Sequence, residues 1–382
     1  MKRLATVLWK TLVHSRHSDA HLRGRRILFL LLFLPAYALL EAWNWLCLGL
    51  DEIFFPRYRN VVVTAPVFIT GIPRSGTTFL HRLLARDRET FTSMTTWEMT
   101  LAPAICQKKL ARALAILDKT LGHPLRKLIL ALEAKTLAHL RTMHPLGFFE
   151  AEEDEVILIH RFSSIYLYLL FPTEELMAFG FFDERIEERT KRRNLQFYRR
   201  CVQRHLYHAG PEKRFLSKNP AFSAKLTSLK STFPDALFLY PIRQPARTIP
   251  SGLSLLAYLY SRFCHIREVA TFQELTLALL THWHEHPLQI FQQWNPETFM
   301  VLPFKTLTRE PSASVTQIYL RLGLPVREDY RALLLAEDKA SRSYQSRHRY
   351  DDTFTRDIPL AWQTRLGQAY EQLLRLAEEG HQ

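Results

Sequence analysis

The sequence has 382 residues, of which 47% are hydrophobic and 23% are charged. This composition excludes a mainly disordered chain, because it supplies enough apolar material for a large core. The formal net charge of +14 implies attraction to anions, which nucleic acid, acidic lipid and polyanionic small molecules all satisfy. No nucleic-acid-binding motif stands out, so we expect no nucleic-acid partner. The 4 cysteines lack CxxC spacing and fit neither a disulfide framework nor a structural zinc site.

Residues 1–60 predict an N-terminal helical segment that associates with a membrane. Residues 27–50 are almost wholly apolar, and Arg23, Arg25 and Arg26 stand just before them. The alternative is a helix buried in the core. Several residues within the stretch favour a bent helix in the membrane interface over a clean span. They are Pro35, Glu41, Trp43, Asn44 and Trp45.

Residues 61–382 predict one α/β domain. Short apolar runs are typical of strands, and helical patterns separate them, which favours a parallel sheet with crossovers on both faces. The expected strands are 66–70, 214–217, 236–240 and 298–303. The expected helices are 104–142, 184–208, 270–293 and 359–379.

The first expected strand runs into a loop, Gly71–Thr78, and a helical pattern resumes at Phe79. Glycines at the two ends of the loop, Gly71 and Gly76, let the backbone wrap around an anion. The amides of Ser75, Gly76, Thr77 and Thr78 would point at that anion from the positive end of the helix. The sequence therefore predicts a phosphate-binding loop.

The loop differs from an ATP-binding loop at one position. Its spacing matches GxxxxGK[ST], except that Thr77 stands where the lysine reaches the β- and γ-phosphates. No acidic residue ends the strand 236–240 to hold magnesium, so phosphoryl transfer lacks two of its parts. We therefore expect the loop to hold a smaller anionic group, with Arg74 supplying positive charge.

A second anion-binding pattern follows the strand 236–240. Arg243 begins an R-x-P sequence, and Ser251 follows further along the chain at the expected start of a helix. A guanidinium fork and a hydroxyl together suit a dianionic phosphomonoester. The two patterns predict a ligand with phosphates at both of its ends.

These segments resemble the sulfotransferase superfamily, particularly its large bacterial branch and the tyrosylprotein sulfotransferases. Residues 71–87 are similar to its 5′-phosphosulfate loop and residues 240–251 to its 3′-phosphate motif. Residues 216–220 and 304–311 match further family segments, so the resemblance covers about residues 61–330. It implies a P-loop-like three-layer fold, with a central parallel sheet and helices on both faces, behind the N-terminal helical appendage.

The resemblance also implies a donor, 3′-phosphoadenosine-5′-phosphosulfate, and the residues that bind it. The ring of Phe79 would lie against the adenine. The donor-binding residues would be Arg74, Ser75, Gly76, Thr77, Thr78, Phe79, Arg243 and Ser251.

The catalytic residues follow from the same resemblance. Lys218, with Arg74, would stabilise charge on the leaving phosphate. Pro220 and Phe222 stand where relatives place a histidine base, so the base must come from elsewhere. We expect Glu98, which resembles the glutamate base of the tyrosylprotein branch, with its pKa raised by partial burial. A helix-capping or salt-bridged glutamate is the alternative.

The acidic run 150–155 is the second candidate for the base. It holds Glu150, Glu152, Glu153, Asp154 and Glu155. An acidic cluster in a basic protein suggests a place beside a cationic element, and a solvated helix start is the alternative. His144 and His348 are weaker candidates.

Three histidines, His282, His284 and His286, suggest a metal site at first sight. They lie in a helical pattern, in which only His282 and His286 share a face, so we expect no metal.

The sequence as a whole predicts a sulfotransferase that passes a sulfuryl group to an acceptor hydroxyl or amine. The alternatives are a P-loop small-molecule kinase and an inactive membrane-tethered anion-binding protein. Acceptor pockets have no recognisable code, so small-molecule, lipid and carbohydrate acceptors stay open. A homodimer is compatible with the sequence.

We expect the catalytic domain to lie in the cytoplasm, attached peripherally to a membrane through residues 27–50. A type II membrane protein of the Golgi is the alternative if the source is eukaryotic.

Overall fold

A computed structural model describes residues 2–13, 15, 19–143, 147–342 and 358–379. Its centre is a five-stranded sheet in the order β2-β3-β1-β4-β5, and every pairing in it is parallel. The strands are β1 (Val67–Ile69), β2 (Phe91–Thr92), β3 (Arg214–Lys218), β4 (Leu237–Ile242) and β5 (Phe299–Pro303). The sequence predicted all of these except β2, which is too short to show a pattern.

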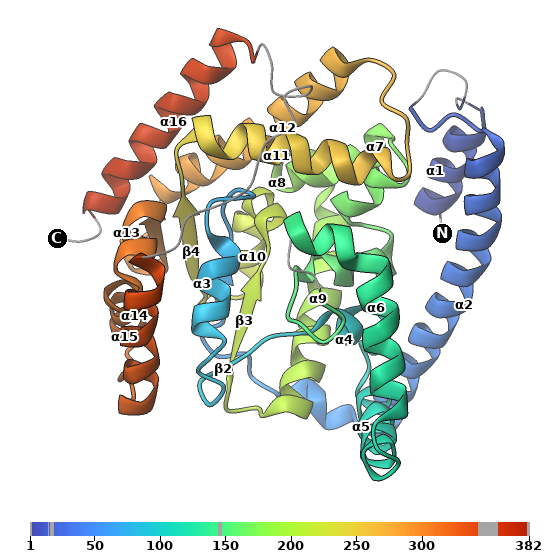
Figure 1. Cartoon of the computed structure of the whole chain (residues 1–382), viewed down its shortest axis with the longest axis horizontal. Helices are drawn as coiled ribbons and strands as arrows, with labels where there is room; N and C mark the ends of the chain where they lie inside the picture. Colours follow the sequence, from blue (N-terminus) through green and yellow to red (C-terminus); the bar gives the residue numbers. More distant parts are fainter. Residues whose placement is uncertain (1, 14, 16–18, 144–146, 343–357, 380–382) are drawn as a thin grey trace.

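Helices make up most of the remaining described chain (Figure 1). They are α1 (Lys2–Val13), α2 (Gly24–Phe54), α3 (Thr77–Leu84), α4 (Thr96–Thr100), α5 (Ile105–Thr120), α6 (Pro124–Met143), α7 (Glu174–Met177), α8 (Phe182–Arg185), α9 (Glu188–Ala209), α10 (Leu226–Thr232), α11 (Pro245–Ser261), α12 (Val269–Phe291), α13 (Phe304–Arg309), α14 (Pro311–Arg321), α15 (Glu328–Arg342) and α16 (Leu360–Glu379). Two 3-10 helices matter below, η3 (Asp154–Arg161) and η6 (Pro220–Ala224).

The two faces of the sheet are covered by different sets of helices. Side chains alternate along a strand, so Phe68 joins the core on one face while Val67 and Ile69 join the core on the other. The first core includes side chains from α9, α10, α11, α12 and α16. The second includes side chains from α3, α13, α14 and α15. The three-layer α/β fold expected from the sequence is therefore confirmed.

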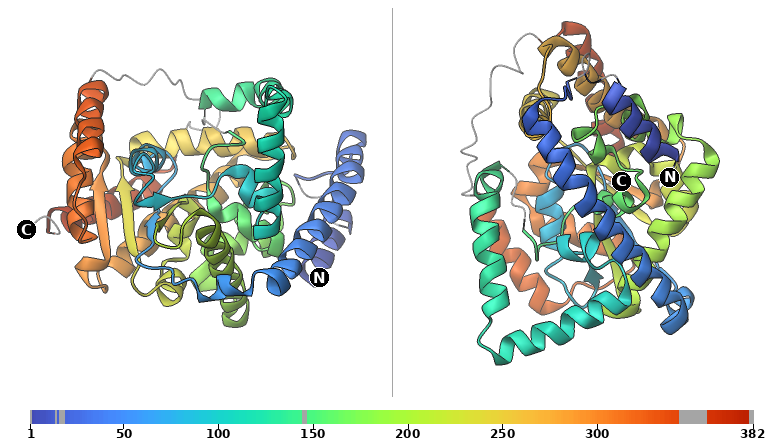
Figure 2. Two further views of the ribbon diagram at one scale, coloured as in Figure 1. Left: turned by 90° about the horizontal axis from the view of Figure 1, so that it is seen from below. Right: turned by 90° about the vertical axis from the view of Figure 1, so that its right-hand side faces the viewer.

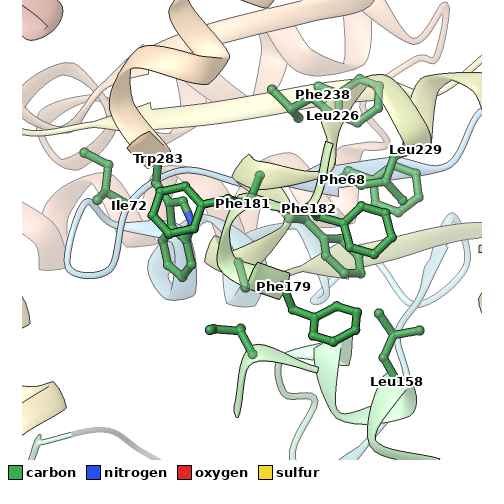
Figure 3. Packing of buried hydrophobic residues seen from close by; sticks show 14 of the residues in the cluster. Phe68, Ile72, Leu158, Phe179, Phe181, Phe182, Leu226, Leu229, Phe238 and Trp283 are labelled. Carbon is green, nitrogen blue, oxygen red and sulfur yellow. The ribbon is translucent and has the colours of Figure 1, made fainter. Parts of the chain in front are cut away.

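Aromatic rings fill the larger core (Figure 3). Phe68 stacks on Phe238 with ring centroids 5.5 Å apart, and the ring of Phe222 lies 6.2 Å from it. Phe222 is fully buried. Phe222, which stands at a position where the family resemblance led us to look for a histidine, is thus part of the apolar core.

The long helix expected at residues 104–142 is broken into α5 and α6. Gly122 has a φ of 81° and His123 a φ of 65°, which no helix accommodates. The carboxylate of Asp118 accepts hydrogen bonds from the amides of Leu125 (2.7 Å) and Arg126 (3.3 Å) at the start of α6. The single-helix prediction was wrong, although Gly122 and Pro124 are ordinary helix breakers.

Helix α2 lies along the side of the molecule with one face against it (Figure 2). The side chain of Asn44 donates to the carbonyl of Thr100 (3.0 Å). Buried Asp51 accepts from the amides of Ile105 (2.7 Å) and Cys106 (3.0 Å). The opposite face is exposed, and α2 is long and apolar enough to cross a membrane. The domain boundary near residue 60 stays a prediction.

Candidate active site

The phosphate loop follows β1 and leads into α3. Gly71 has a φ of 108° and Gly76 a φ of 101°, in the left-handed region that favours glycine. A Cβ on Gly71 would lie 2.9 Å from the carbonyl oxygen of Pro241, and one on Gly76 would lie 2.9 Å from Cδ2 of Phe304. Both ends of the loop therefore require glycine, because the loop passes closely between the end of β4 and the start of α13.

Two serine hydroxyls hold the loop in shape. The Ser75 hydroxyl donates to the carbonyl of Ile72 (2.8 Å) and is fully buried. The Ser223 hydroxyl, from η6, accepts from the amide of Gly71 (3.0 Å) and donates to its carbonyl (2.9 Å). The amide of Ser75 also donates to the carbonyl of Ile72 (3.2 Å), so this amide, one of the four expected to meet an anion, is used inside the loop. Ser75 thus shapes the loop with both its side chain and its backbone.

The loop ends at the positive end of α3. Gly76 is the residue before the helix, and Thr77 and Thr78 are its first two residues. The first amides of a helix have no acceptor inside it, so they attract anions. Phe79 is partly buried and packs against the smaller core. Its contact with an adenine stays a prediction.

The two anion-binding patterns meet in space. Nε of Arg74 donates to the hydroxyl of Ser251 (3.0 Å), and Nη1 of Arg243 donates to the carbonyl of Arg74 (3.4 Å). The Arg243 guanidinium lies 4.2 Å from the ring centre of Phe304. Ser251 lies in the second turn of α11, not at its start as expected, because the helix begins at Pro245.

Lys218 ends the strand next to the loop. It lies opposite Ile69 of β1 and is 1% exposed. Its Nζ is 3.3 Å from a carboxylate oxygen of Glu153 and 3.5 Å from one of Glu152. A buried cation therefore lies at the carboxyl edge of the sheet, beside the phosphate loop and two carboxylates.

The acidic run lies against the segment that follows β3. Asp154 accepts from the hydroxyl of Tyr198 (2.5 Å) and the amide group of Asn219 (3.3 Å), and buried Glu155 pairs with buried Lys225. Glu150 is exposed. Most of the run is therefore packed beside cations and hydrogen-bond donors, and the solvated-helix alternative does not describe it.

Burial changes the proton affinity of two carboxylates in this run. It raises the pKa of Glu152 to about 7, although the charge of Lys218 opposes the shift. Burial also raises the pKa of Asp154 to about 6, against its hydrogen bonds from Tyr198 and Asn219. Glu152 thus exchanges protons near neutral pH.

Glu98 has different surroundings. Its carboxylate accepts from the amide and the hydroxyl of Thr95, both at 2.8 Å, in a capping box at the start of α4. Nζ of Lys108 donates to it (2.9 Å), and His205 lies 3.5 Å away. Burial alone would raise the pKa of Glu98, but Lys108 and His205 hold it well below its usual range. The expected rise in the pKa of Glu98 is contradicted.

Several partners at the site were missed in the sequence. Lys108 and His205 come from α5 and α9, and both are buried around Glu98. Ser223 and Phe304 touch the loop from η6 and α13. Phe304 lies in the family segment 304–311, although its contact with the loop could not be predicted from it. The other three residues carry no motif, because the fold alone brings them to the site. His144 and His348 lie outside the described residues.

The histidines of α12 have an acidic neighbour that the helical pattern did not show. Glu184, from α8, lies with its carboxylate 3.6 Å from Nδ1 of His282 and 3.9 Å from Nδ1 of His286. One ligand-type atom from each of the three residues lies within 4.8 Å of the others. His284 instead contacts the carbonyl of Leu280 (2.7 Å).

A family model described as "Sulfotransferase family" matches residues 66–329. The match covers more than half of the chain and includes the loop, Lys218, Arg243 and Ser251. The chain belongs to the sulfotransferase family, and it is a transferase.

Curated proteins named omega-hydroxy-beta-dihydromenaquinone-9 sulfotransferase Stf3, from Mycobacterium bovis and Mycobacterium tuberculosis, are each 27% identical over 350 residues, which are 88% of this chain and 82% of theirs. The fold is similar to that of two solved structures. Sulfotransferase STF1 from Mycobacterium tuberculosis has a TM-score of 0.67 at 18% identity, covering 96% of this chain and 91% of that one. Sulfotransferase STF9 from Mycobacterium avium has a TM-score of 0.63 at 19% identity, covering 87% and 79%.

Proposed function

We propose that this sulfotransferase takes its sulfuryl group from 3′-phosphoadenosine-5′-phosphosulfate. The observation that carries the proposal is the meeting of Arg74, Arg243 and Ser251 at the phosphate loop. Two guanidinium groups, a hydroxyl and the amides of a helix start suit a ligand with two separate phosphate groups. The ring of Phe304 fills the space that a side chain at position 76 would need, so glycine is required at this end of the loop.

Each residue of the site has a separate task. Arg243 and Ser251 bind the 3′-phosphate, while Arg74 and the loop amides bind the 5′-phosphate. Lys218 stabilises the negative charge that develops on this phosphate as it leaves. When bound, the donor supplies the sulfuryl group, whose bond to the phosphate oxygen breaks as the acceptor oxygen bonds to sulfur. A carboxylate of the protein takes the acceptor proton.

Two carboxylates are candidates for the base that takes the acceptor proton. Glu98 is the base that the family resemblance implies, but its carboxylate already interacts with Lys108, His205 and Thr95, which lower its pKa. Glu152 lies 3.5 Å from Nζ of Lys218, and its pKa of about 7 suits proton uptake at neutral pH. These surroundings favour Glu152 as the base and a positioning role for Glu98.

Calorimetry with adenosine-3′,5′-bisphosphate tests the donor. We expect the bisphosphate to bind much more tightly than AMP, because Arg243 and Ser251 require a 3′-phosphate. Arg243→Ala should weaken this binding by about 2–5 kcal/mol, since the phosphate loses its charged partner. Arg247→Ala is the control, because Arg247 is exposed and is not one of the two residues, Arg243 and Ser251, proposed to bind the phosphate. Equal affinity for AMP and the bisphosphate would refute the donor.

We propose a lipid hydroxyl as the acceptor. The relatives named Stf3 act, by their name, on a hydroxylated menaquinone derivative. The exposed apolar face of α2 would place the enzyme where such a lipid is found. Incubating lipid extracts with sulfur-labelled donor and identifying the labelled product by mass spectrometry tests this choice. Label found only in water-soluble products would contradict it.

We also propose that the catalytic domain lies in the cytoplasm and is attached peripherally through residues 27–50. The hydrogen bonds of Asn44 and Asp51 hold one face of α2 against the protein, so lipid can reach only the other face. Protease protection in sealed inside-out vesicles tests the topology. The domain should be digested from the cytoplasmic side, and its protection there would instead indicate a true span with the domain across the membrane.

A further inference from the structure

The paired helices α5 and α6 expose a large apolar surface. Leu110, Leu114 and Leu117 of α5, and Leu121 just after its end, follow one another at helical spacing and so share one face. Each is between 46% and 66% exposed. A surface helix of a globular protein normally turns such a stripe toward the core. Here the leucines are exposed, as are most other side chains of α5 from residue 109 onward.

Helix α6 repeats this arrangement. Leu125, Leu128 and Leu132 share one face and are each between 47% and 57% exposed. Residues 109–135, which we call the leucine hairpin, thus carry exposed leucines on both of their helices. The hairpin stands at the outer edge of the molecule (Figure 2).

The leucine hairpin is held in a defined position. The hydrogen bonds from the amides of Leu125 and Arg126 to the carboxylate of Asp118 fix the turn between its helices. At its base, Asp51 of α2 binds the first amides of α5, and the thiol of Cys106 donates to the carbonyl of Cys47 (3.4 Å). The hairpin is therefore fastened to the end of α2, the helix proposed to contact a membrane.

The charge of the hairpin selects its partner. Its cations are all exposed: Lys109, Arg112, Lys119, Arg126, Lys127 and Lys135. Its only acidic residues, Asp118 and Glu133, are buried. Arg112 and Lys119 lie on the face of α5 opposite the leucines. Exposed leucines bordered by cations are typical of helices that lie in the interface of an anionic bilayer.

We propose that the leucine hairpin is a second membrane-binding element, which inserts its leucines into a bilayer that contains anionic lipid. A second copy of this chain is a poorer occupant, because it would bring the same cations into contact with one another. The proposal extends the peripheral attachment through α2 and rests on it. With two elements bound at different positions, the enzyme would be held in one orientation on the lipid surface.

Vesicle binding by the full-length chain tests the hairpin. The double variant Leu117→Glu/Leu128→Glu should bind phosphatidylcholine vesicles containing phosphatidylglycerol about tenfold more weakly than wild type, since it loses apolar burial and meets anionic headgroups. The matched control is Leu320→Glu/Leu360→Glu, at positions 80% and 76% exposed outside the hairpin. It adds the same charge and should bind as wild type does.

Further measurements separate the outcomes. Unchanged affinity for adenosine-3′,5′-bisphosphate shows that each variant is folded and that the proposed donor site is intact. If Leu31→Glu/Leu32→Glu on α2 abolishes vesicle binding while the hairpin variant binds as wild type, the hairpin proposal is wrong and the α2 attachment stands.

Sedimentation velocity without vesicles provides the other check. A wild-type dimer that the hairpin variant dissociates would assign the leucines to a second copy and overturn the proposal.

Discussion

Glu98 and Glu152 are the same chemical group in opposite electrostatic settings. Glu98 has Lys108 at 2.9 Å and two hydrogen bonds from Thr95, so its charged form is favoured. Glu152 is buried, and its cation, Lys218, is more distant. Burial therefore stabilises its neutral form relative to its charged form, and its pKa rises to about 7. The direction of each pKa shift follows from the number and distance of the donors around the carboxylate.

This contrast predicts the pH dependence of turnover. With Glu152 as the base, activity should rise with pH as its carboxyl loses a proton, and it should level off above pH about 7. Glu152→Gln should lower turnover by about two to four orders of magnitude and remove this rise. Donor affinity should hardly change. The measurement is the turnover rate across pH with saturating donor.

Glu98→Gln serves as the comparison. It should keep the rise in activity with pH, although it strips buried Lys108 of its carboxylate and should lower the free energy of unfolding by about 3–5 kcal/mol. Thermal unfolding separates this loss of stability from a loss of chemistry. A well-folded but inactive Glu98→Gln, beside an active Glu152→Gln, would return the role of base to Glu98.

At the scale of elements, the phosphate loop depends on contacts from segments far along the chain. Gly76 faces Phe304 of α13, and the guanidinium of Arg243 lies over the same ring. A side chain at position 76 would therefore disturb the loop and the arginine at the same time.

Gly76→Ala should show both effects. Its φ of 101° costs a non-glycine residue about 1–3 kcal/mol, and its Cβ would meet Phe304 at 2.9 Å. Gly122→Ala is the matched control, because Gly122 has a φ of 81° but no atom within 4 Å of the added Cβ. Both variants should lower the unfolding free energy in denaturant titrations. Only Gly76→Ala should weaken bisphosphate binding. Equal binding by the two variants would show that the Phe304 ring can move aside without disturbing the site.

The sequence predicts local features of this site better than distant ones. The loop and the Arg243 motif are continuous segments with fixed spacing, so they could be recognised before the fold was known. The surroundings of Glu98 could not, because Lys108 and His205 reach it from two other helices. Gly122 and Pro124 are local signals for the break between α5 and α6, and the prediction of one helix over 104–142 did not take them into account.

At the scale of the whole molecule, Asp51 connects α2 to the helices of the catalytic domain. Asp51 is fully buried and accepts from two amides of α5 and from Nε of Arg204 (3.1 Å). It thus joins α2, α5 and α9 at one point.

Asp51→Ala should therefore lower the free energy of unfolding by about 3–5 kcal/mol, because it leaves Nε of buried Arg204 and two amides of α5 without their acceptor. Glu52→Ala is the control. Glu52 also pairs with Arg204 (2.7 Å) but is 31% exposed, so its loss should cost about 1 kcal/mol or less. Denaturant titration of both variants decides, and similar losses would mean that Asp51 is not the main connection.

The central position of β1 governs the order in which the chain can fold during synthesis. Val67 pairs with Leu216 on one side and Leu237 on the other, so both neighbours of β1 leave the ribosome long after it does. Until then its apolar residues have no sheet to join, and contacts so distant in sequence form slowly. Helix α2 is complete much earlier. We therefore expect the nascent chain to reach a lipid surface or a chaperone through α2 before its catalytic domain has folded.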